Sequence, residues 1–291
     1  MNELGGARAE PMSRHTSLHI GGPADYFVRV RSEADLVGAV RVAREAELPT
    51  FVLGGGTNLL VADAGIRGVV LENAWSEVRV HGTMLDAASG TPLASVAAVA
   101  ARSGIIGLEW MATVPGTVGG AVHGNAGAFG SDTASALIDA RLLDLGGDLW
   151  NMRVDELGYG YRSSSLQTTP LICVRARFQG EPGDRSTAVL RIKELANERI
   201  AKQPLAQPNT GSIFRNPPGD HAGRLIEAAG LKGARSGDAL VSEKHANFIV
   251  NLGNATASDV RALMRRCQES VKGQFGIDLV PEVELVGEWD A

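Results

Sequence analysis

A glycine-rich stretch at residues 114–130 has the composition of a site for an anionic ligand. It reads Val-Pro-Gly-Thr-Val-Gly-Gly-Ala-Val-His-Gly-Asn-Ala-Gly-Ala-Phe-Gly. Glycine is kept where φ must be positive or where a group must approach the main chain closely. Consecutive exposed N–H groups can form an anion-binding concavity, and Asn125 adds a side chain that both donates and accepts. An ordinary glycine-rich turn between two strands is an alternative interpretation of the same pattern.

A second glycine-rich loop, Gly54-Gly55-Gly56-Thr57-Asn58, follows a short apolar strand at residues 51–53. It is not the Rossmann fingerprint, because Leu59 stands where the third glycine is required, and no Gly-Lys-Ser/Thr follows as in a P-loop. The apolar run at residues 59–62 predicts a strand after the loop. Loop amides, rather than a helix N-terminus, would therefore hold an anion. The two loops together could hold the two ends of a dinucleotide.

Three polar residues outside these loops could act on a bound substrate. Ser212 is a poor hydrolase nucleophile because position 214 is Phe and Gly-x-Ser-x-Gly is absent, but it could donate a proton. Its alternative role is to cap local backbone. Arg162 could bind a carboxylate bidentately, or it is a solvated surface charge. Glu282 is expected to begin a strand, where an edge position that favours solubility is the alternative.

Basic residues of the second half, Arg215, Lys244 and His245, could meet a diphosphate, although each taken alone has the character of a surface residue. His19 and His123 have no ligand-spaced partners, so we predict no metal site. Lys and Arg number 28 against 33 Asp and Glu, giving a net charge of −5. That balance argues against bulk attraction to nucleic acid or to acidic membranes.

The chain has the composition of a cytoplasmic protein of about two domains. No apolar run reaches the ~18 residues that span a bilayer, and no signal peptide follows the first residues. Cys173 and Cys267 lack metal spacing and are expected to be buried thiols in a reducing compartment.

Hydrophobic periodicity predicts an alternation of short strands and helices. Ser32 with Asp35 and Thr256 with Asp259 form capping boxes, Thr91 is expected to cap a helix with Pro92 at its first position, and residues 1–14 are expected to be frayed. A composition shift predicts a domain boundary at residues 185–205. The expected helices are 32–47, 91–103, 187–202, 220–229 and 256–275, and the expected strands are 26–30, 51–53, 59–62, 68–71, 138–143, 149–154 and 171–178.

Six ordered motifs resemble the UDP-N-acetylenolpyruvoylglucosamine reductase family, also called UDP-N-acetylmuramate dehydrogenase, over residues 15–287. The two glycine loops alone would indicate only the broader flavin-binding class typified by vanillyl-alcohol oxidase. The motifs are Gly-Gly-Gly-Thr-Asn-Leu-Leu-Val at 54–61, Pro-Gly-Thr-Val-Gly-Gly-Ala at 115–121 with Asn-Ala-Gly-Ala at 125–128, Tyr-Arg-Ser-Ser at 161–164, Gly-Ser-Ile-Phe-Arg-Asn-Pro at 211–217, Ser-Glu-Lys-His-Ala-Asn-Phe at 242–248 and Pro-Glu-Val at 281–283.

The resemblance implies an α+β protein with a two-subdomain FAD-binding module of the vanillyl-alcohol-oxidase type and an α+β substrate-binding domain. The expected domains are 1–73, 74–186 and 187–291, the last with a C-terminal strand that returns to the active site. The chain is similar to the shorter type, without the tyrosine-bearing insertion. It departs from the family pattern at Thr113 and Asp238, where Gly is usual, and at Arg215, where Lys is common.

The resemblance also implies the cofactor FAD, the reductant NADPH and the substrate UDP-N-acetylglucosamine enolpyruvate, in a cytoplasmic enzyme expected to be a monomer. Hydride from N5 of reduced FAD would reach C3 of the enolpyruvyl group, Ser212 would protonate C2, and Arg162 would neutralise charge on the carboxylate. Glu282 would help only if protonated or paired with Arg162. Tyr161, Asn216, Lys244 and Arg215 are the implied substrate contacts. The implied FAD contacts are Gly54, Gly55, Gly56, Thr57, Asn58, Leu59, Pro115, Gly116, Thr117, Gly119, Gly120, Ala121, Asn125, Ala126 and Ala128.

Two other functions remain open from the sequence. One is a flavin oxidase of the broader class, which would pass electrons to oxygen and act on another substrate. The other is a non-catalytic protein that binds a nucleotide sugar and has kept the fold. Air reoxidation of the reduced protein would favour the first, and a colourless purified protein would favour the second.

Overall fold

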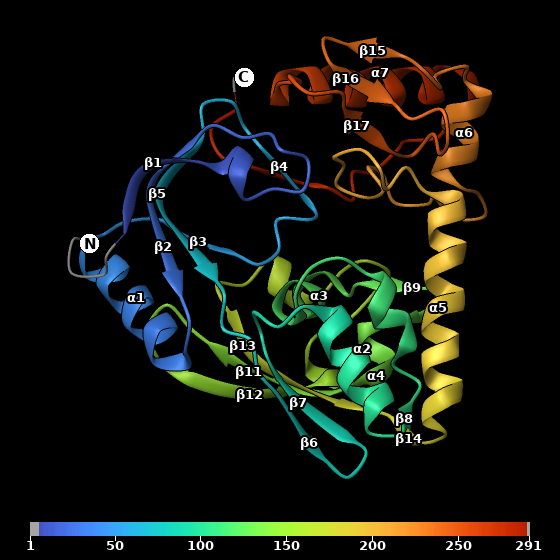
Figure 1. Cartoon of the computed structure of the whole chain (residues 1–291). Helices are drawn as coiled ribbons and strands as arrows, with labels where there is room; N and C mark the ends of the chain where they lie inside the picture. The colour runs from blue at the N-terminus through green and yellow to red at the C-terminus, as the bar shows by residue number, and fades with distance from the viewer. Residues whose placement is uncertain (1–5, 290–291) are drawn as a thin grey trace. The chain divides into compact units, whose positions relative to one another are not determined.

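A computed structural model describes residues 6–289, which form an α+β fold with mixed helices and sheets (Figure 1). The chain divides into two compact units. Unit 1 comprises residues up to Ala7, Tyr26–Gly55 and Gly68–Arg199. Unit 2 comprises Arg8–Asp25, Gly56–Arg67 and the chain from Ile200 onward. The three domains expected from the sequence stay a prediction, because this division by contacts does not test a subdivision of unit 1.

Unit 1 is built on a five-stranded antiparallel sheet. Its strands, in spatial order, are β12 (Leu149–Arg153), β11 (Leu137–Leu143), β13 (Ile172–Gln179), β7 (Met84–Ala88) and β6 (Val78–His81). The hairpin and the strand that the sequence predicted at residues 138–143, 149–154 and 171–178 are confirmed. The sheet therefore joins a local hairpin to strands far away in the sequence.

Helices α2 (Leu93–Arg102) and α3 (Val118–Gly124) cover one face of this sheet (Figure 1). Their apolar side chains form one core with Leu142 of β11 and Phe178 of β13, both fully buried. Helix α1 (Glu33–Glu45) packs in a separate core that includes Leu143 and Val174. Leu142 and Leu143, neighbours on β11, thus face two different cores, as the alternation of side chains along a strand requires.

The first core also contains the small elements that connect these helices and strands. Burial of apolar surface contributes roughly 25 cal/mol per Å², so these short segments are stabilised by packing rather than by their own length. They are β8 (Ile105–Ile106), η3 (Glu109–Thr113), α4 (Thr133–Ala136), η4 (Val154–Glu156) and η5 (Ser165–Gln167). Three further short strands, β9 (Gly127–Ala128), β10 (Ser131–Asp132) and β14 (Glu181–Pro182), contribute no side chain to this core.

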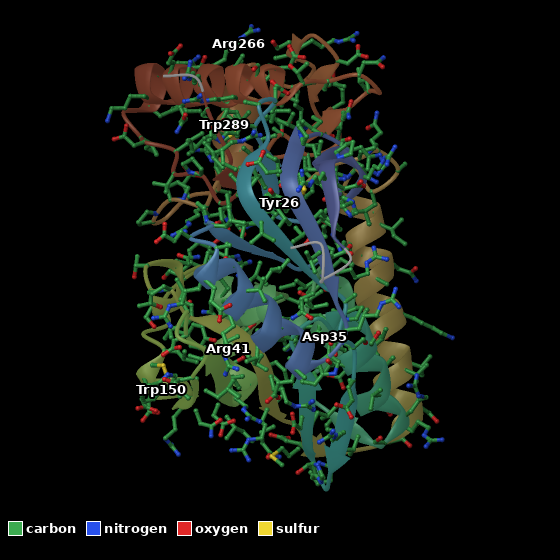
Figure 2. The ribbon with its side chains drawn as sticks, turned by 90° about the vertical axis from the view of Figure 1, so that its left-hand side faces the viewer. Tyr26, Asp35, Arg41, Trp150, Arg266 and Trp289 are labelled. Atoms are coloured by element: carbon green, nitrogen blue, oxygen red, sulfur yellow. The ribbon has the colours of Figure 1, made fainter. Side chains whose placement is uncertain are left out.

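The core around α1 also holds the parallel strands β3 (Thr50–Leu53) and β5 (Ile66–Asn73), which belong to a four-stranded sheet in the order β1-β2-β5-β3. Strands β1 (Ala7–Pro11) and β2 (Pro23–Val30) complete that sheet. Arg41 of α1 and Trp150 of β12 lie on the same side of unit 1 (Figure 2). An added Cβ at Gly147, in the β11–β12 turn, would stand 3.1 Å from the Arg41 Nε atom.

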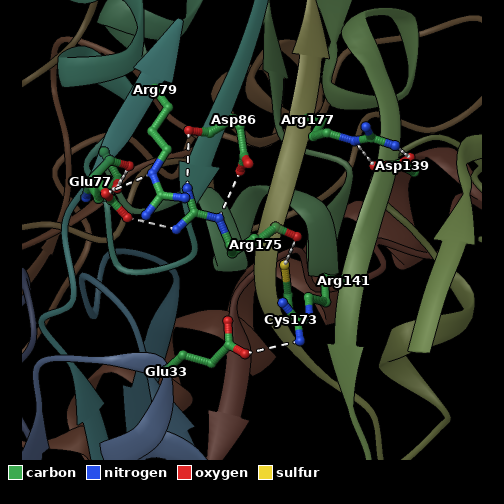
Figure 3. Close-up of polar contacts among 10 residues, drawn as sticks. Glu33, Glu77, Arg79, Asp86, Asp139, Arg141, Cys173, Arg175 and Arg177 are labelled. Atoms are coloured by element: carbon green, nitrogen blue, oxygen red, sulfur yellow. Dashed lines mark hydrogen bonds and ion pairs between the residues drawn. The ribbon is translucent and has the colours of Figure 1, made fainter. Parts of the chain in front are cut away.

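A row of ion pairs crosses the five-stranded sheet (Figure 3). The buried Arg175 of β13 donates from Nη1 to Glu77 Oε2 at 2.8 Å and from Nε to Asp86 Oδ1 at 2.7 Å. Two residues further along β13, Arg177 pairs with Asp139 of the neighbouring strand β11. A buried guanidinium must be paired to avoid a large desolvation penalty, and the hydrogen bond from Arg175 lowers the pKa of the Glu77 carboxyl. These pairs hold β13, β7 and the segment before β6 in register.

Unit 2 contains a three-stranded antiparallel sheet and the long helix α7 (Ala257–Phe275). The capping box of Thr256 and Asp259 forms at the start of α7, as the sequence predicted, and Gly276 ends the helix with a φ of +70°. The Asp63 carboxylate also accepts from the N–H groups of Ala257 and Ser258 at 2.8 and 2.9 Å. The other elements are η2 (Met12–Arg14), α6 (Ala222–Ala228), β15 (Arg235–Ser236), β16 (Ala239–Val241) and β17 (Ile249–Asn251), with α5 (Arg185–Lys202) crossing from unit 1.

A parallel pair of short strands joins two segments of unit 2 that lie far apart in the sequence. Strand β18 (Glu284–Val286) pairs with β4 (Leu59–Val61), with Glu284 opposite Leu59. Trp289, after β18, lies under Arg261 of α7 at 5.0 Å from the guanidinium carbon to the ring centre, and Figure 2 labels its position. The pairing places the second half of the Gly54–Asn58 loop directly before a strand that meets the C-terminal segment.

Three local predictions are wrong. Thr91 does not cap α2, because its Oγ1 atom exchanges hydrogen bonds with the backbone of Glu77 at 3.0 Å, and Pro92 takes the cap position without a side-chain bond. Residues 7–14 form β1 and η2 rather than a frayed end, while residues 1–5 of that prediction lie outside the described residues. The Ser32 hydroxyl does accept from Asp35 N, but the Asp35 carboxylate accepts from Arg31 N instead of from Ser32.

Both cysteines are buried free thiols, as predicted. Burial raises the pKa of the Cys173 and Cys267 thiols to about 12, so both stay protonated at neutral pH. Among residues 6–289, no helix is long and apolar enough to cross a membrane. In the same range, no group of three or more His, Cys, Asp or Glu side chains could hold a metal ion.

Candidate active site

The two glycine-rich loops meet within unit 1 at Gly54 and Thr117. A Cβ atom added to Gly54 would stand 2.4 Å from Thr117 Oγ1, closer than real side chains approach, and one added to Gly120 would stand 3.9 Å away. The Thr117 side chain is 8% exposed, and its hydroxyl has no hydrogen bond to residues 6–289. A side chain at position 54 would therefore have to displace the Thr117 hydroxyl, whereas Gly54 itself has no left-handed φ.

The glycine stretch at residues 114–130 differs from the expected open loop, because α3 occupies its centre. The N–H groups of Val118 and Gly119 donate to the carbonyls of Thr91 and Ser89 at 2.9 and 2.7 Å. They are therefore not exposed to a ligand, which corrects the prediction of consecutive free amides. An added Cβ at Gly119 would lie 3.1 Å from the Ser89 side chain, so this glycine serves close packing.

Other amides of the two loops do match an anion-binding cradle. Within residues 6–289, the N–H groups of Gly54, Gly55 and Gly120 donate no hydrogen bond. Gly54 is half-buried, whereas Gly55 and Gly120 are exposed, so these donors are open to solvent and could serve an external acceptor such as a phosphate. The ligand-binding interpretation of these loops stays a prediction that the open amides allow.

The remainder of the first loop belongs to unit 2. Gly56 has a φ of +60°, its carbonyl accepts from Ser17 N at 3.0 Å, and an added Cβ would reach His15 O at 2.0 Å. Asn58 does not point its amide at a ligand, because Nδ2 donates to the backbone carbonyl of Glu282 at 3.0 Å. Asn58 thus ties the loop to the C-terminal segment.

Arg162 stands in a tight two-residue turn fastened to the C-terminus of α3. Its φ is +54°, an uncommon conformation for a residue with a side chain. Gly160 and Ser163 on either side exchange both backbone hydrogen bonds, at 3.0 and 3.2 Å. Strain of this kind persists where the surroundings over-determine it, and it concentrates at functional sites.

Side chains around this turn bond to the end of α3. Ser164 Oγ donates to His123 O at 2.6 Å, and Tyr159 Oη donates to Val122 O at 3.0 Å. Asn125, which caps α3 with a φ of +46°, donates from Nδ2 to Gly160 O at 2.9 Å. The orphan carbonyls of the helix end are thereby satisfied, and desolvation raises the pKa of the Tyr159 hydroxyl, which stays protonated as a donor.

The Arg162 guanidinium is directed at the β9–β10 hairpin. Its Nη2 atom donates to Gly127 O at 2.7 Å, and its Cζ atom lies 5.2 Å from the centre of the Tyr161 ring. The Tyr161 side chain is 54% exposed. The turn therefore presents an oriented cation and an exposed ring from unit 1.

In unit 2, the backbone brings the Ser212 segment beside Glu282. Ile213 O accepts from Glu282 N at 2.8 Å, and Arg215 N donates to Val280 O at 2.9 Å. Asn58 completes the group through its bond to the Glu282 carbonyl. The backbone thus brings together three predicted site residues that are widely separated in the sequence, namely Asn58, Ser212 and Glu282. Arg162 belongs to unit 1.

The Ser212 hydroxyl is available for chemistry. It is half-buried, and it makes no hydrogen bond to any residue of the described range 6–289. The alternative role of capping local backbone is therefore not observed. Gly211 before it has a φ of +78° and donates to Asn209 Oδ1 at 3.0 Å, which fixes how the segment enters the site.

Asn247 is a positioning residue that sequence reasoning did not single out. Its Oδ1 accepts from Phe214 N at 3.0 Å and its Nδ2 donates to Phe214 O at 2.8 Å, with Asn247 only 3% exposed. Its own carbonyl accepts from Ile213 N at 2.9 Å. The Asn247 side chain thus bonds to both backbone groups of Phe214, as a neighbouring strand would. Its place inside the Ser-Glu-Lys-His-Ala-Asn-Phe motif was the one sign of this role in the sequence.

The other predicted substrate contacts have mixed surroundings. Asn216 Oδ1 accepts from Ala222 N at 3.0 Å at the start of α6, and Lys244 Nζ donates to Ile200 O at 2.6 Å. Arg215 Nε is buried without a hydrogen-bond acceptor in the described residues, so this side chain can take an added acceptor.

Burial lowers the pKa of the His245 imidazole, which makes it a poor cation for a diphosphate at neutral pH. Glu282 precedes the strand it was expected to begin, because β18 starts at Glu284.

Two family models match separate parts of the chain, and known proteins match nearly all of it. An FAD binding domain matches residues 24–153, and the C-terminal domain of UDP-N-acetylenolpyruvoylglucosamine reductase matches residues 203–286. UDP-N-acetylenolpyruvoylglucosamine reductase 2 of Symbiobacterium thermophilum is 46% identical over 282 residues, which cover 96% of this chain and 92% of that protein. The chain belongs to the UDP-N-acetylenolpyruvoylglucosamine reductase family. The reductase of Caldanaerobacter subterraneus is 43% identical over 96% of this chain and 93% of its own length.

A solved structure of the same reductase family agrees with this assignment. The crystal structure of UDP-N-acetylenolpyruvylglucosamine reductase from Thermus caldophilus superposes with a TM-score of 0.82 at 36% identity. It covers 95% of this chain and 97% of the other. The predicted α+β fold class, the flavoprotein oxidoreductase class with its cell-wall role and the FAD cofactor are confirmed at the level of the reductase family.

The unit 1 cradle leads to a prediction about FAD retention. We expect Gly54→Ala to weaken FAD binding about tenfold or more, because an added methyl group displaces the Thr117 hydroxyl and overpacking costs about 1–3 kcal/mol. The measurement is the FAD dissociation constant of the refolded or deflavinated protein. Gly38→Ala in α1 is the matched control, since nothing lies within 4 Å of its added Cβ. Equal FAD affinity in both variants would contradict this role for Gly54.

Proposed function

We propose that this protein reduces UDP-N-acetylglucosamine enolpyruvate to UDP-N-acetylmuramate, with FAD as bound cofactor and NADPH as reductant. The observation that carries the proposal is the free Ser212 hydroxyl, held by the backbone beside Glu282 in a chain of the reductase family. We also propose that the reaction takes place in the cytoplasm, where nucleotide sugars and NADPH are made. A monomeric state stays a prediction.

The substrate determines what the protein residues must do. Its enolpyruvyl double bond is conjugated to a carboxylate, so addition of hydride at C3 builds negative charge at C2 and on the carboxylate oxygens. When bound, FAD supplies that hydride after taking it from NADPH. The protein must stabilise the charge at one end of the group and deliver a proton to C2.

Ser212 is the proposed proton donor to C2. A hydroxyl with no competing acceptor is free to turn its proton toward a bound substrate, and positioned general acids contribute about 10²–10⁴-fold. Asn247 and the Ile213–Glu282 bond fix the segment that carries it. After transfer, water or a neighbouring group restores the proton to the Ser212 oxygen.

Arg162 and Glu282 are the proposed partners of the carboxylate. The Arg162 guanidinium is pre-oriented by Gly127 O, and an oriented cation stabilises developing negative charge without reorganising. Glu282 stabilises the same charge as a protonated carboxyl or as a partner of a guanidinium. Arg215, whose buried Nε lacks an acceptor, and Lys244, Asn216 and Tyr161 are proposed contacts to the rest of the substrate.

FAD would be held by the loop and helix residues already described. In unit 1 these are the unpaired amides of Gly54, Gly55 and Gly120 with the Thr117 hydroxyl, which fit a phosphate oxygen. The whole proposed set remains the one that the family motifs implied: Gly54 to Leu59, Pro115, Gly116, Thr117, Gly119, Gly120, Ala121, Asn125, Ala126 and Ala128. The chain lacks a Rossmann fingerprint for a second dinucleotide, which is consistent with NADPH and substrate using one flavin face in turn.

The experiment that tests the proposed function measures the NADPH consumed and the UDP-N-acetylmuramate formed, with and without oxygen. We expect one NADPH consumed and one UDP-N-acetylmuramate formed for each substrate molecule under anaerobic conditions. Consumption of NADPH that requires oxygen and yields no UDP-N-acetylmuramate would instead establish a flavin oxidase. Binding of the nucleotide sugar without any turnover would establish the non-catalytic alternative.

A further inference from the structure

Phe129 is an exposed aromatic residue in a backbone conformation that its side chain disfavours. It has a φ of +54°, and 40% of its surface is exposed. The next residue, Gly130, has a φ of +81°. The two form the turn of the β9–β10 hairpin, in which Ala128 pairs with Ser131 and Gly127 with Asp132.

A two-residue hairpin turn with two positive φ values normally carries Asn-Gly or Asp-Gly. Asparagine tolerates this conformation and hydrogen-bonds locally, whereas a bulky residue there is an outlier. A phenylalanine gains nothing from the turn itself, and two fifths of its surface stays open to solvent instead of packing within the protein. Position 129 therefore carries an aromatic ring although the turn favours asparagine and much of the ring is exposed.

The hairpin is held tightly at both ends, so the ring has a defined place. Gly127 O accepts from Arg162 Nη2 at 2.7 Å, and Asp132 Oδ2 accepts from Asn125 Nδ2 at 3.2 Å. An added Cβ at Gly127 would lie 2.4 Å from Ser131 O, which shows how closely the strands approach. Phe129 thus stands two residues from the carbonyl that orients the proposed carboxylate-binding guanidinium.

We propose that Phe129 is a binding residue for the planar nicotinamide ring of the reductant, an inference that rests on the proposed function. The reacting group of the substrate is a small carboxylate, which Arg162 recognises by charge. The reacting group of NADPH is a flat ring that has no carboxylate for Arg162. An exposed phenyl face supplies offset stacking to the reduced ring and a cation–π contact to the oxidised one.

Phe129→Asn tests this proposal because it separates the turn from the ring. Asparagine suits the positive φ, so we expect the melting temperature of the variant to equal or exceed that of the wild type. Loss of the ring should raise the dissociation constant of NADP⁺, measured by calorimetry, about tenfold. It should raise the NADPH concentration needed for half-maximal anaerobic flavin reduction by the same factor.

Two control variants make the comparison specific. Phe129→Tyr keeps the ring in the same turn and is expected to bind NADP⁺ within twofold of wild type. Glu47→Asn relieves another positive φ, +53°, at an exposed position after α1. It is expected to match or raise the melting temperature and to leave NADP⁺ affinity unchanged.

Several outcomes would overturn the proposal. Unchanged NADP⁺ affinity in Phe129→Asn would show that the ring does not contact the reductant. Loss of FAD from that variant would place the ring at the cofactor, and weaker binding of the UDP-sugar alone would place it at the uracil. A wild type that binds no NADP⁺ would overturn this inference together with the proposed function, whereas normal wild-type reduction with an unaffected Phe129→Asn variant would overturn this inference alone.

Discussion

Replacing Ser212 by alanine is expected to slow reoxidation of the reduced protein by the UDP-sugar enolpyruvate about 100- to 10,000-fold. Flavin reduction by NADPH should stay within twofold of wild type, because no proton from this hydroxyl is needed there. The Ser212 hydroxyl has no other partner in residues 6–289, so its removal leaves no protein group unpaired. Stopped-flow absorbance of the bound flavin measures the two half-reactions separately.

Ser212→Cys is the matched variant, since a thiol still carries a transferable proton in nearly the same place. It should recover part of the rate that alanine loses, with a different dependence on pH because a free thiol has a pKa near ~8.5. Equal slowing of both half-reactions in Ser212→Ala would mean that the residue shapes the pocket and does not deliver the proton.

Replacing Arg162 by alanine is expected to lower kcat for the UDP-sugar about 100- to 1,000-fold, the effect of removing one preorganised donor from a developing negative charge. The loss should be larger in the half-reaction with substrate than in the reduction by NADPH. Arg162→Lys keeps the charge but not the planar fork that binds a carboxylate bidentately, so its rate should fall between those of the wild type and the alanine variant.

Arg185→Ala provides the control for Arg162. Arg185 is an exposed arginine of unit 1 that donates to the backbone carbonyl of Arg102, as the half-buried Arg162 donates to that of Gly127. Its removal should leave both half-reactions unchanged. An Arg162→Ala variant with near wild-type kcat and only a weaker FAD affinity would assign Arg162 to holding the hairpin and the cofactor, not to the substrate carboxylate.

Local rules predicted the elements whose determinants lie within a few residues. Thr256 and Asp259 cap α7 through bonds between residues three apart, and the β11–β12 hairpin closes over a short turn. Thr91 was misassigned because its hydroxyl bonds to Glu77, which is 14 residues earlier. A side chain that can satisfy either a helix end or a distant backbone group gives no local sign of which it will choose.

Helix α3 was missed because three of its seven residues are glycine, and glycine is a poor helix former. The helix is instead fixed from outside, by Ser89 O at Gly119 N and by the Tyr159 hydroxyl at Val122 O. These partners come from other segments, so the helix follows from tertiary contacts that periodicity does not reveal.

The candidate site was predicted in its residue types but not in its assembly. Ser212, Glu282 and Asn58 were each named from motifs, yet their proximity depends on Ile213 O, the Asn58 amide and the β4–β18 pairing across more than 200 residues. No spacing rule predicts such a pairing. Asn58 was expected to contact the cofactor, whereas its amide bonds to Glu282 O.

The visible spectrum of the purified protein, recorded anaerobically before and after NADPH and then after the UDP-sugar enolpyruvate, tests the central claim most directly. We expect a yellow protein whose flavin absorbance is lost with NADPH and restored in full by one equivalent of the UDP-sugar, with UDP-N-acetylmuramate recovered from the solution. A colourless protein, or a reduced flavin that only air and not the UDP-sugar reoxidises, would contradict the account.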